Sequence, residues 1–251
     1  MKIFFSILLC VLIICGTSGC IHKEAKSEKT PDETECVWNG ENSFLVSSSL
    51  WMPGTCTDKG KDYEINTVNH MEKNDTVNVE MKYPSLTGNT REFDRVNELI
   101  KSQVYCIYED WARFVEADSK VTLELDYEVA LAGKRFISIV FQGYANNTSA
   151  VHPSSIVFTM NIDLESQEQV KVCDVIKFNE AFFETVRKNF VKNLSNEQRE
   201  YIESLDLKAL FDRADETNSS VFVYYTYDAL NVIFLIPHAI GDFAEITIIN
   251  A

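Results

Sequence analysis

Residues 121–144 read VTLELDYEVALAGKRFISIVFQGY, two runs rich in β-branched and aromatic residues with a short break between them. The runs, Val121–Leu131 and Arg135–Tyr144, have the composition of β-strands, and the break Ala132-Gly133-Lys134 is typical of a tight turn. The stretch therefore predicts a β-hairpin, and the remaining elements can be placed around it.

Apolar residues on either side of this hairpin repeat with the period of strands or of helices. Five further segments favour strands, namely residues 76–83, 156–162, 221–227, 231–236 and 243–249. Apolar residues at steps of three and four predict an amphipathic helix over 93–114. Asn179 is placed to cap a second helix, and Ser195 with Gln198 has capping-box spacing for a third. Strands adjacent in sequence, with helices in blocks, predict an α+β fold of two subdomains with largely antiparallel sheet.

The composition is that of a folded, acidic protein. Hydrophobic residues make up 45% of the 251 residues, which is enough for a core. The 23 Lys and Arg residues against 38 Asp and Glu give a formal net charge of -15. Because nucleic-acid binding depends on Lys and Arg at the phosphates, this balance argues against nucleic acid and suits a cationic partner.

The N-terminus has the layout of an export signal. Met1-Lys2 precedes an apolar run, Ile3–Ile14, that is too short to span a bilayer comfortably. Thr17-Ser18-Gly19-Cys20 resembles a bacterial lipobox, although Thr17 replaces the usual Leu. We therefore expect a signal peptide over residues 1–19 and a membrane anchor of lipid on Cys20. The alternatives are ordinary cleavage to a soluble product and an uncleaved anchor.

Export would change the charge and the location of the chain. Loss of residues 1–19 removes Lys2 and leaves 22 basic against 38 acidic residues, a formal charge of -16. Residues 20–60 are expected to form a polar lipid-anchored tether and an irregular lead-in. The lipoprotein would lie on the outer face of the cytoplasmic membrane, or in the periplasm or outer membrane.

Four cysteines remain after the signal and Cys20 are set aside: Cys36, Cys56, Cys106 and Cys173. An even number in an exported chain permits two disulfides, with three possible connectivities. Cys36 with Cys56 is the favoured pair because it closes a short loop. A zinc site is the competing interpretation, but the sequence lacks CxxC and His-x-x-His spacing, so neither a metal nor a cofactor is expected.

The first half of the folded part resembles a known domain. Tyr83-Pro84-Ser85-Leu86, followed by a helix with Asn97-Glu98-Leu99-Ile100, is similar to the PdaC-type domain (DUF4163) that precedes a peptidoglycan deacetylase domain. This resemblance covers residues 61–145. The deacetylase domain itself has no counterpart in this sequence.

The second half, residues 146–251, resembles the RsiV-type domain family (DUF3298). Its motifs are Gly143-Tyr144, which lies just before this range, His152-Pro153, a stretch through Asp163 to Asp174, and a closing segment with Pro237 and Gly241. Gln167 replaces the family's Gly, so the turn there must avoid the left-handed conformation or bear strain. Because this domain pair forms the extracellular part of lysozyme-sensing regulators, the resemblance implies a binding role outside the membrane.

The sequence displays no recognisable catalytic motif. His70, His152 and His238 stand in polar or turn contexts, and Ser155 lies close to His152. Neighbours in sequence rarely form a nucleophile–base pair, so the motif residues are expected to serve the fold and not catalysis. Those residues are Tyr83, Pro84, Asn97, Gly143, Tyr144, His152, Pro153, Asp163, Asp174, Pro237 and Gly241. Glu124, Asp126 and Glu128 alternate along one strand and predict a solvated face.

The leading functional hypothesis is a non-enzymatic cell-envelope lipoprotein that binds a ligand. The ligand would be a cationic protein such as lysozyme, which the charge and the resemblance favour, or a cell-wall component. A peptidoglycan-acting enzyme, or an accessory subunit of one, is the alternative. A passive structural lipoprotein is the second alternative.

Overall fold

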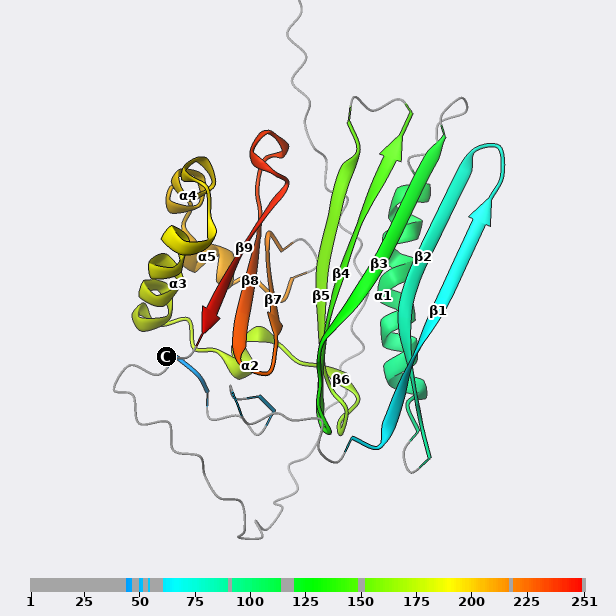
Figure 1. Ribbon diagram of the computed structural model, residues 1–251, viewed down its shortest axis with the longest axis horizontal. Coiled ribbons are helices and arrows are strands. Elements are labelled where there is room, and N and C mark those ends of the chain that lie inside the picture. The colour runs from blue at the N-terminus through cyan, green and yellow to red at the C-terminus, as the bar shows by residue number, and fades with distance from the viewer. Residues whose placement is uncertain are drawn as a thin grey trace, which may run out of the picture. The chain divides into compact units, whose positions relative to one another are not determined.

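The computed structural model describes residues 44–46, 50–51, 54, 61–89, 92–113, 120–148, 152–216 and 219–249. Within these ranges it contains a six-stranded sheet, a three-stranded sheet and helices packed against both, which confirms the α+β prediction (Figure 1). The predicted signal peptide, the lipidation site Cys20 and the favoured pair Cys36–Cys56 lie outside the described residues.

The larger sheet has the strand order β1-β2-β3-β4-β5-β6. Its strands are β1 (Tyr63–Lys73), β2 (Val77–Gly88), β3 (Val121–Ala132), β4 (Phe136–Asn147), β5 (Ser154–Asp163) and β6 (Glu168–Gln169). The β3–β4 hairpin is present as predicted. Neighbouring strands are antiparallel except β2 and β3, which run parallel because helix α1 (Asp94–Ala112) crosses between them. The expected boundary at residue 146 falls at the end of β4, whose hydrogen-bonded neighbour is β5.

Helix α1 covers one face of this sheet. Val96, Ile100 and Val104 are fully buried on the helix side, in one hydrophobic cluster with inward residues of β2 and β3. The side chain of Asn97 fixes the helix to β2, since its Oδ1 accepts a hydrogen bond from the Leu86 N–H at 2.8 Å. Its Nδ2 donates to the Leu86 carbonyl at 2.9 Å. The motif residue Asn97 therefore has a structural role.

The smaller sheet consists of β7 (Val221–Tyr225), β8 (Ala229–Leu235) and β9 (Phe243–Ile249), with a 3-10 turn η1 (His238–Ile240) before β9. Four helices belong to this part: α2 (Val172–Val175), α3 (Glu180–Asn193), α4 (Asn196–Glu203) and α5 (Leu207–Phe211). Their apolar side chains, among them Phe182, Phe190 and Phe211, pack with strand residues in a second cluster. Asn179 caps α3, and the capping box of Ser195 with Gln198 is present, both as predicted.

Part of the lead-in belongs to this second cluster. Trp51 is 1% exposed, and its ring centroid lies 4.8 Å from the ring centroid of Tyr225. Its Nε1–H donates to the Thr226 carbonyl at 2.8 Å. Leu45 forms a β-bridge with Ile176. The described residues of the segment predicted to be irregular therefore complete the second hydrophobic core.

The two sheets contact each other through β4, β5 and β7. Ser138 Oγ accepts from the Tyr225 N–H and donates to Asn161 Oδ1, and Asn161 Nδ2 donates to the Val223 carbonyl. All these distances are between 2.7 and 2.9 Å, and Ser138 and Asn161 are buried. Val140 and Val157 pack with Ile233 beside this network. The smaller sheet therefore covers β4 and β5 on the face of the larger sheet that is opposite α1.

The disulfide candidates Cys106 and Cys173 are not joined to each other. Both are exposed, and the described part of the chain contains no disulfide. Cys106 lies on α1, which packs against the larger sheet, whereas Cys173 lies on α2, whose buried residues belong to the second cluster. Because the two helices belong to different cores, Cys106 and Cys173 do not form a disulfide with each other, and the described residues do not support a disulfide at either cysteine.

Candidate functional site

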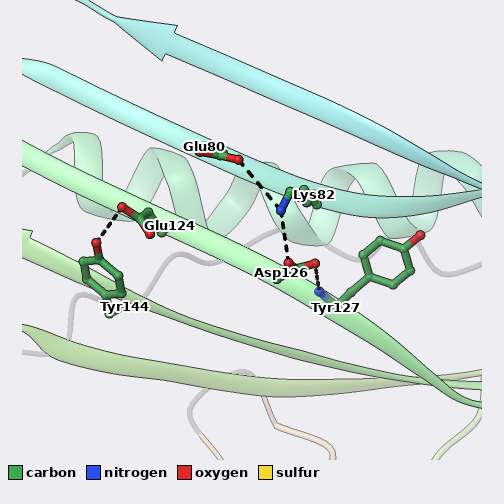
Figure 2. Close-up of polar contacts among 6 residues, drawn as sticks. All are labelled: Glu80, Lys82, Glu124, Asp126, Tyr127 and Tyr144. Carbon is green, nitrogen blue, oxygen red and sulfur yellow. Dashed lines mark hydrogen bonds and ion pairs between the residues drawn. The ribbon is translucent and has the colours of Figure 1, made fainter.

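The face of the larger sheet opposite α1 carries a group of acidic side chains on β2 and β3. Successive side chains of a strand point to opposite faces, and Val79 and Met81 are buried on the α1 side. Glu80 and Lys82 therefore lie on the other face (Figure 2). On β3 the exposed residues Glu124, Asp126 and Glu128 alternate with buried or half-buried ones, as the sequence predicts. We call Glu80, Glu124, Asp126 and Glu128 the acidic face.

Cross-strand pairing aligns one row of side chains over five strands. Met71 of β1 is paired with Glu80, Glu80 with Glu124, Glu124 with Tyr144 of β4, and Tyr144 with Ser155 of β5. Met71 is 74% exposed at the outer end of this row. The pairing sets two glutamates directly against each other, which is unfavourable in a sheet.

Lys82 is the cation that lies among these carboxylates. Its Nζ is 3.2 Å from Asp126 Oδ2 and 3.8 Å from Glu80 Oε1 (Figure 2). The hydrogen bond and the charge of Asp126 raise the pKa of Lys82, so the ammonium group stays charged. With one cation against four carboxylates, the acidic face keeps an excess of negative charge in the part of the chain that the structure describes.

One tyrosine, Tyr144, lies beside the carboxylates of the acidic face. Tyr144 donates from its hydroxyl to Glu124 Oε1 at 2.5 Å, and this hydrogen bond raises the pKa of Tyr144 (Figure 2). Tyr127 alternates with Asp126 and Glu128, is half buried and packs with the cluster on the α1 side, so it is not part of the acidic face. An exposed phenol ring next to charged groups, as at Tyr144, is frequent in protein–protein contacts. The arrangement is suited to binding a cationic surface.

A second polar group lies at the β5 end of the same row. Ser155 Oγ donates to Asp242 Oδ2 at 2.6 Å, and Asp242 Oδ1 is 2.8 Å from His238 Nδ1. The ring of His152 lies against that of His238, with centroids 5.2 Å apart. Hydrogen bonds from Ser155 and then from His238 lower the pKa of Asp242. We call these four residues the histidine cluster.

Two solved structures are similar to this fold. No family model matches the sequence, and no curated protein matches it. A DUF3298 family protein from Pseudomonas aeruginosa PAO1 matches 76% of this chain and 92% of its own, at 14% identity and a TM-score of 0.47. A DUF3298 member from Bacteroides fragilis NCTC 9343 matches over 76% of this chain and 91% of its own chain, at 13% sequence identity and a TM-score of 0.47. The structural neighbours are DUF3298 proteins.

Several residues that the DUF3298 resemblance singled out support strand ends and turns. Asp163, 8% exposed at the end of β5, accepts from the Glu165 N–H at 2.9 Å and pairs with Arg135 at 3.2 Å. Gln167 does adopt the left-handed conformation, with φ of 56°. Gly241, with φ of 120°, occupies a conformation that side chains rarely adopt.

The remaining motif residues lie in three places. Tyr83 and Pro84 are buried on β2, and Gly143 is packed against the β3 backbone. Asp174 is exposed in the first turn of α2, while Asn179 caps α3. Pro153 directly precedes β5, and Pro237 directly precedes η1. Of the motif residues, Tyr144 is hydrogen-bonded to the acidic face and His152 belongs to the histidine cluster. Pro153, Pro237 and Gly241 adjoin members of that cluster in the sequence.

The grouping of Ser155, His152, His238 and Asp242 was missed at the sequence level. Ser155 and Asp242 are 87 residues apart, and no spacing rule connects them. The Ser155 hydroxyl donates to the carboxylate, so in this arrangement Asp242 lies between the serine and the His238 imidazole. Among the described residues there is no group of three or more His, Cys, Asp or Glu placed to hold a metal ion. Nor is any helix there long and apolar enough to cross a membrane.

Proposed function

We propose that this chain is a non-enzymatic lipoprotein of the cell envelope that binds a cationic protein through the acidic face. The observation that supports the proposal is the concentration of Glu80, Glu124, Asp126 and Glu128 on one open sheet surface. A chain with a formal charge of -15 also attracts cations at long range, which speeds association with a basic partner.

The energetics of the face favour a cationic ligand. Glu80 and Glu124 repel each other across paired strands, and Lys82 contacts Asp126 more closely than it contacts Glu80. An arginine or lysine from a partner would relieve that repulsion while it gains its own charge-assisted hydrogen bonds. A residue arrangement that is unfavourable in the free protein and favourable in a complex is typical of a binding surface.

The proposed ligand is a small basic protein of the lysozyme kind, and the test uses lysozyme itself. Calorimetric titration of the purified chain would compare the parent with the triple variant Glu80→Gln, Glu124→Gln and Asp126→Asn. The matched control removes the same number of charges from exposed helical positions, with Glu184→Gln, Glu200→Gln and Glu203→Gln. We expect at least a tenfold loss of affinity for the first variant and at most about a threefold loss for the control.

Two results would contradict the proposal. Equal loss in both triple variants would show that net charge acts without a specific surface. Absence of heat with lysozyme at low salt, with the parent chain folded, would exclude this ligand. The chain could instead sediment with purified cell wall, with this binding lost in the first variant and kept in the control. That result would favour a cell-wall component as the ligand in place of a cationic protein.

The anchor requires a separate test because it lies outside the described residues. Labelled palmitate should be incorporated into the parent chain and not into Cys20→Ala. The same substitution should release the chain from the membrane fraction or leave an unprocessed precursor. Labelling that persists in Cys20→Ala would refute lipidation at this residue, whereas the binding proposal would stand.

A further inference from the structure

The acidic face already holds one cation of the protein itself. Lys82 Nζ lies 3.2 Å from Asp126 Oδ2 and 3.8 Å from Glu80 Oε1 (Figure 2). Asp126 belongs to β3 and Glu80 to β2, so a single ammonium group lies between carboxylates of two neighbouring strands. We call the place of this ammonium group the cation position. It marks where the sheet surface holds a positive charge in the free protein.

The carboxylates around the cation position are oriented by further contacts. Asp126 Oδ1 accepts from the Tyr127 N–H at 2.8 Å, while Oδ2 accepts from the Lys82 ammonium. Glu124, on the same strand, accepts from the Tyr144 hydroxyl at 2.5 Å. Groups that are held in this way lose little freedom when a ligand binds, so the surface is prepared for a cation.

The ion pair of Lys82 can be exchanged for another one. The Lys82 side chain is 38% exposed and that of Asp126 is 63% exposed. Ion pairs at such sites are weak, because water screens the charges and the long lysine side chain loses freedom. A guanidinium group is planar with five N–H donors and can bond to two carboxylates at once, whereas an ammonium group is a point charge. An arginine from a partner therefore gains more at the cation position than Lys82 does.

We propose that Lys82 is a built-in competitor of the partner: its ammonium group occupies the cation position in the free protein, and an arginine of the partner displaces it in the complex. The inference rests on the proposed binding of a cationic protein at the acidic face. It adds the class of side chain that is recognised, which is arginine. A lysine from the partner exchanges one ammonium group for another with little gain, so lysine-rich ligands bind poorly.

The test measures the binding of hexa-arginine and hexa-lysine peptides to the purified chain by calorimetry at one low salt concentration. The parent should bind hexa-arginine at least about fivefold more tightly than hexa-lysine. Lys82→Met removes the competitor and keeps an unbranched side chain, so the affinity for both peptides should rise at least about fivefold. The matched control Lys188→Met removes the same charge from an exposed position on α3 and should raise either affinity at most about twofold.

Lys82→Arg separates competition from net charge. This variant keeps the charge of the parent, so an effect of net charge alone predicts no change. Its guanidinium group should hold Asp126 and Glu80 more strongly than the ammonium group does, and the affinity for hexa-arginine should fall about threefold or more. In the parent, the NMR signal of the Lys82 ε-carbon gives a second readout, since it should move when hexa-arginine displaces the ammonium group.

The competitor role is overturned if Lys82→Met and Lys188→Met bind hexa-arginine equally well, or if Lys82→Arg binds it like the parent. Each variant is used only with a parent-like thermal melt, and Lys82→Arg decides the question where Lys82→Met is unstable. The peptides do not depend on lysozyme. Lysozyme binding that is the same in all Lys82 variants would remove the competitor and keep the proposed function. The expected order of peptide affinities without lysozyme binding would exclude lysozyme and support arginine recognition.

Discussion

Glu80 on β2 lies directly opposite Glu124 on β3 in the parallel part of the larger sheet. A pair of like charges in this position lowers the stability of the sheet. Lys82 offsets part of the repulsion, but its closer contact is with Asp126 at 3.2 Å. The acidic face is therefore a region where the free protein carries electrostatic repulsion.

Removal of one of the two charges should stabilise the fold. We expect Glu80→Gln to raise the free energy of unfolding by about 0.2–1 kcal/mol, since it ends the repulsion with Glu124 and keeps the shape of the side chain. Urea denaturation measures the change, and Glu184→Gln on α3 is the control. A loss of stability in Glu80→Gln would mean that its contact with Lys82 outweighs the repulsion.

Gly143 on β4 cannot accept a side chain. A Cβ atom at this position would lie 2.0 Å from the Glu124 carbonyl oxygen and 2.9 Å from the Leu125 Cα, and both belong to the β3 backbone. We expect Gly143→Ala to destabilise the protein by about 1–3 kcal/mol or more. Gly133→Ala, whose Cβ would lie 3.2 Å from the Phe136 carbonyl, should destabilise it less. Urea midpoints in the reverse order would show that β3 and β4 separate easily.

Gln167 occupies a left-handed conformation that favours glycine. Its φ is 56°, and its Nε2 donates to the Glu92 carbonyl at 2.9 Å. Both Gln167→Gly and Gln167→Ala lack this hydrogen bond. A comparison of the two variants therefore isolates the cost of the left-handed backbone conformation. We expect the glycine variant to be more stable by about 1 kcal/mol, as measured by thermal melts. Equal melts would indicate that this turn relaxes to another conformation.

Tyr108 on α1 should make stability fall at alkaline pH. Its hydroxyl donates to Glu72 Oε2 at 2.6 Å, and this bond, followed by burial, raises the pKa of Tyr108 to about 12 from an ordinary 10.0. Below pH 10 both the folded and the unfolded chain keep the proton. As the pH rises from 10 to 12, the unfolded chain releases it first, so the free energy of unfolding falls.

The variant Tyr108→Phe isolates this contribution. It should be less stable than the parent at pH 8, because the hydrogen bond is lost, but its stability should depend less on pH between 10 and 12. Urea denaturation at several pH values gives both quantities. Parallel curves for parent and variant in this range would show that Tyr108 is not the group responsible.

The start of α3 depends on Asn179 and not on Asp174. Asn179 Oδ1 accepts from the Phe182 N–H at 3.0 Å, whereas Asp174 is exposed within α2. We expect Asn179→Ala to lower the free energy of unfolding by about 0.5–2 kcal/mol. Asp174→Ala should have a smaller effect. Thermal melts in the opposite order would show that Asp174 contributes more to this region than the Asn179 cap does.

Local sequence patterns were sufficient for most individual elements. The β3–β4 hairpin, α1 and the capping box of α4 follow from period, turn residues and caps, and each is present. Strand β1 had no such signal. Its sequence YEINTVNHMEK is largely polar because the strand lies at the sheet edge, with few positions buried. His70, which stands in a polar stretch of the sequence, is half buried there, and its Nδ1 lies 3.0 Å from the Tyr105 hydroxyl.

Contacts between segments far apart in the chain could not be predicted from the sequence. The alternation of Glu124, Asp126 and Glu128 predicted a solvated face, but only the parallel register of β2 with β3 brings Glu80 against it. The contact between Ser155 and Asp242 likewise depends on how two sheets pack. Such contacts arise from tertiary structure, so periodicity within a short segment carries no information about them.

The docking of Trp51 against Tyr225 and Thr226 has a consequence for the order of folding. The indole N–H and its carbonyl partner are 175 residues apart, so this contact closes a loop that includes nearly all of the described strands and helices. During synthesis or export from the N-terminus, the larger sheet can assemble while Trp51 is still without its partner. The second core closes only after β7 has emerged, and contacts of such long sequence separation form slowly. A chain stopped before Tyr225 would expose the Trp51 indole, and proteases and chaperones act on such apolar surface.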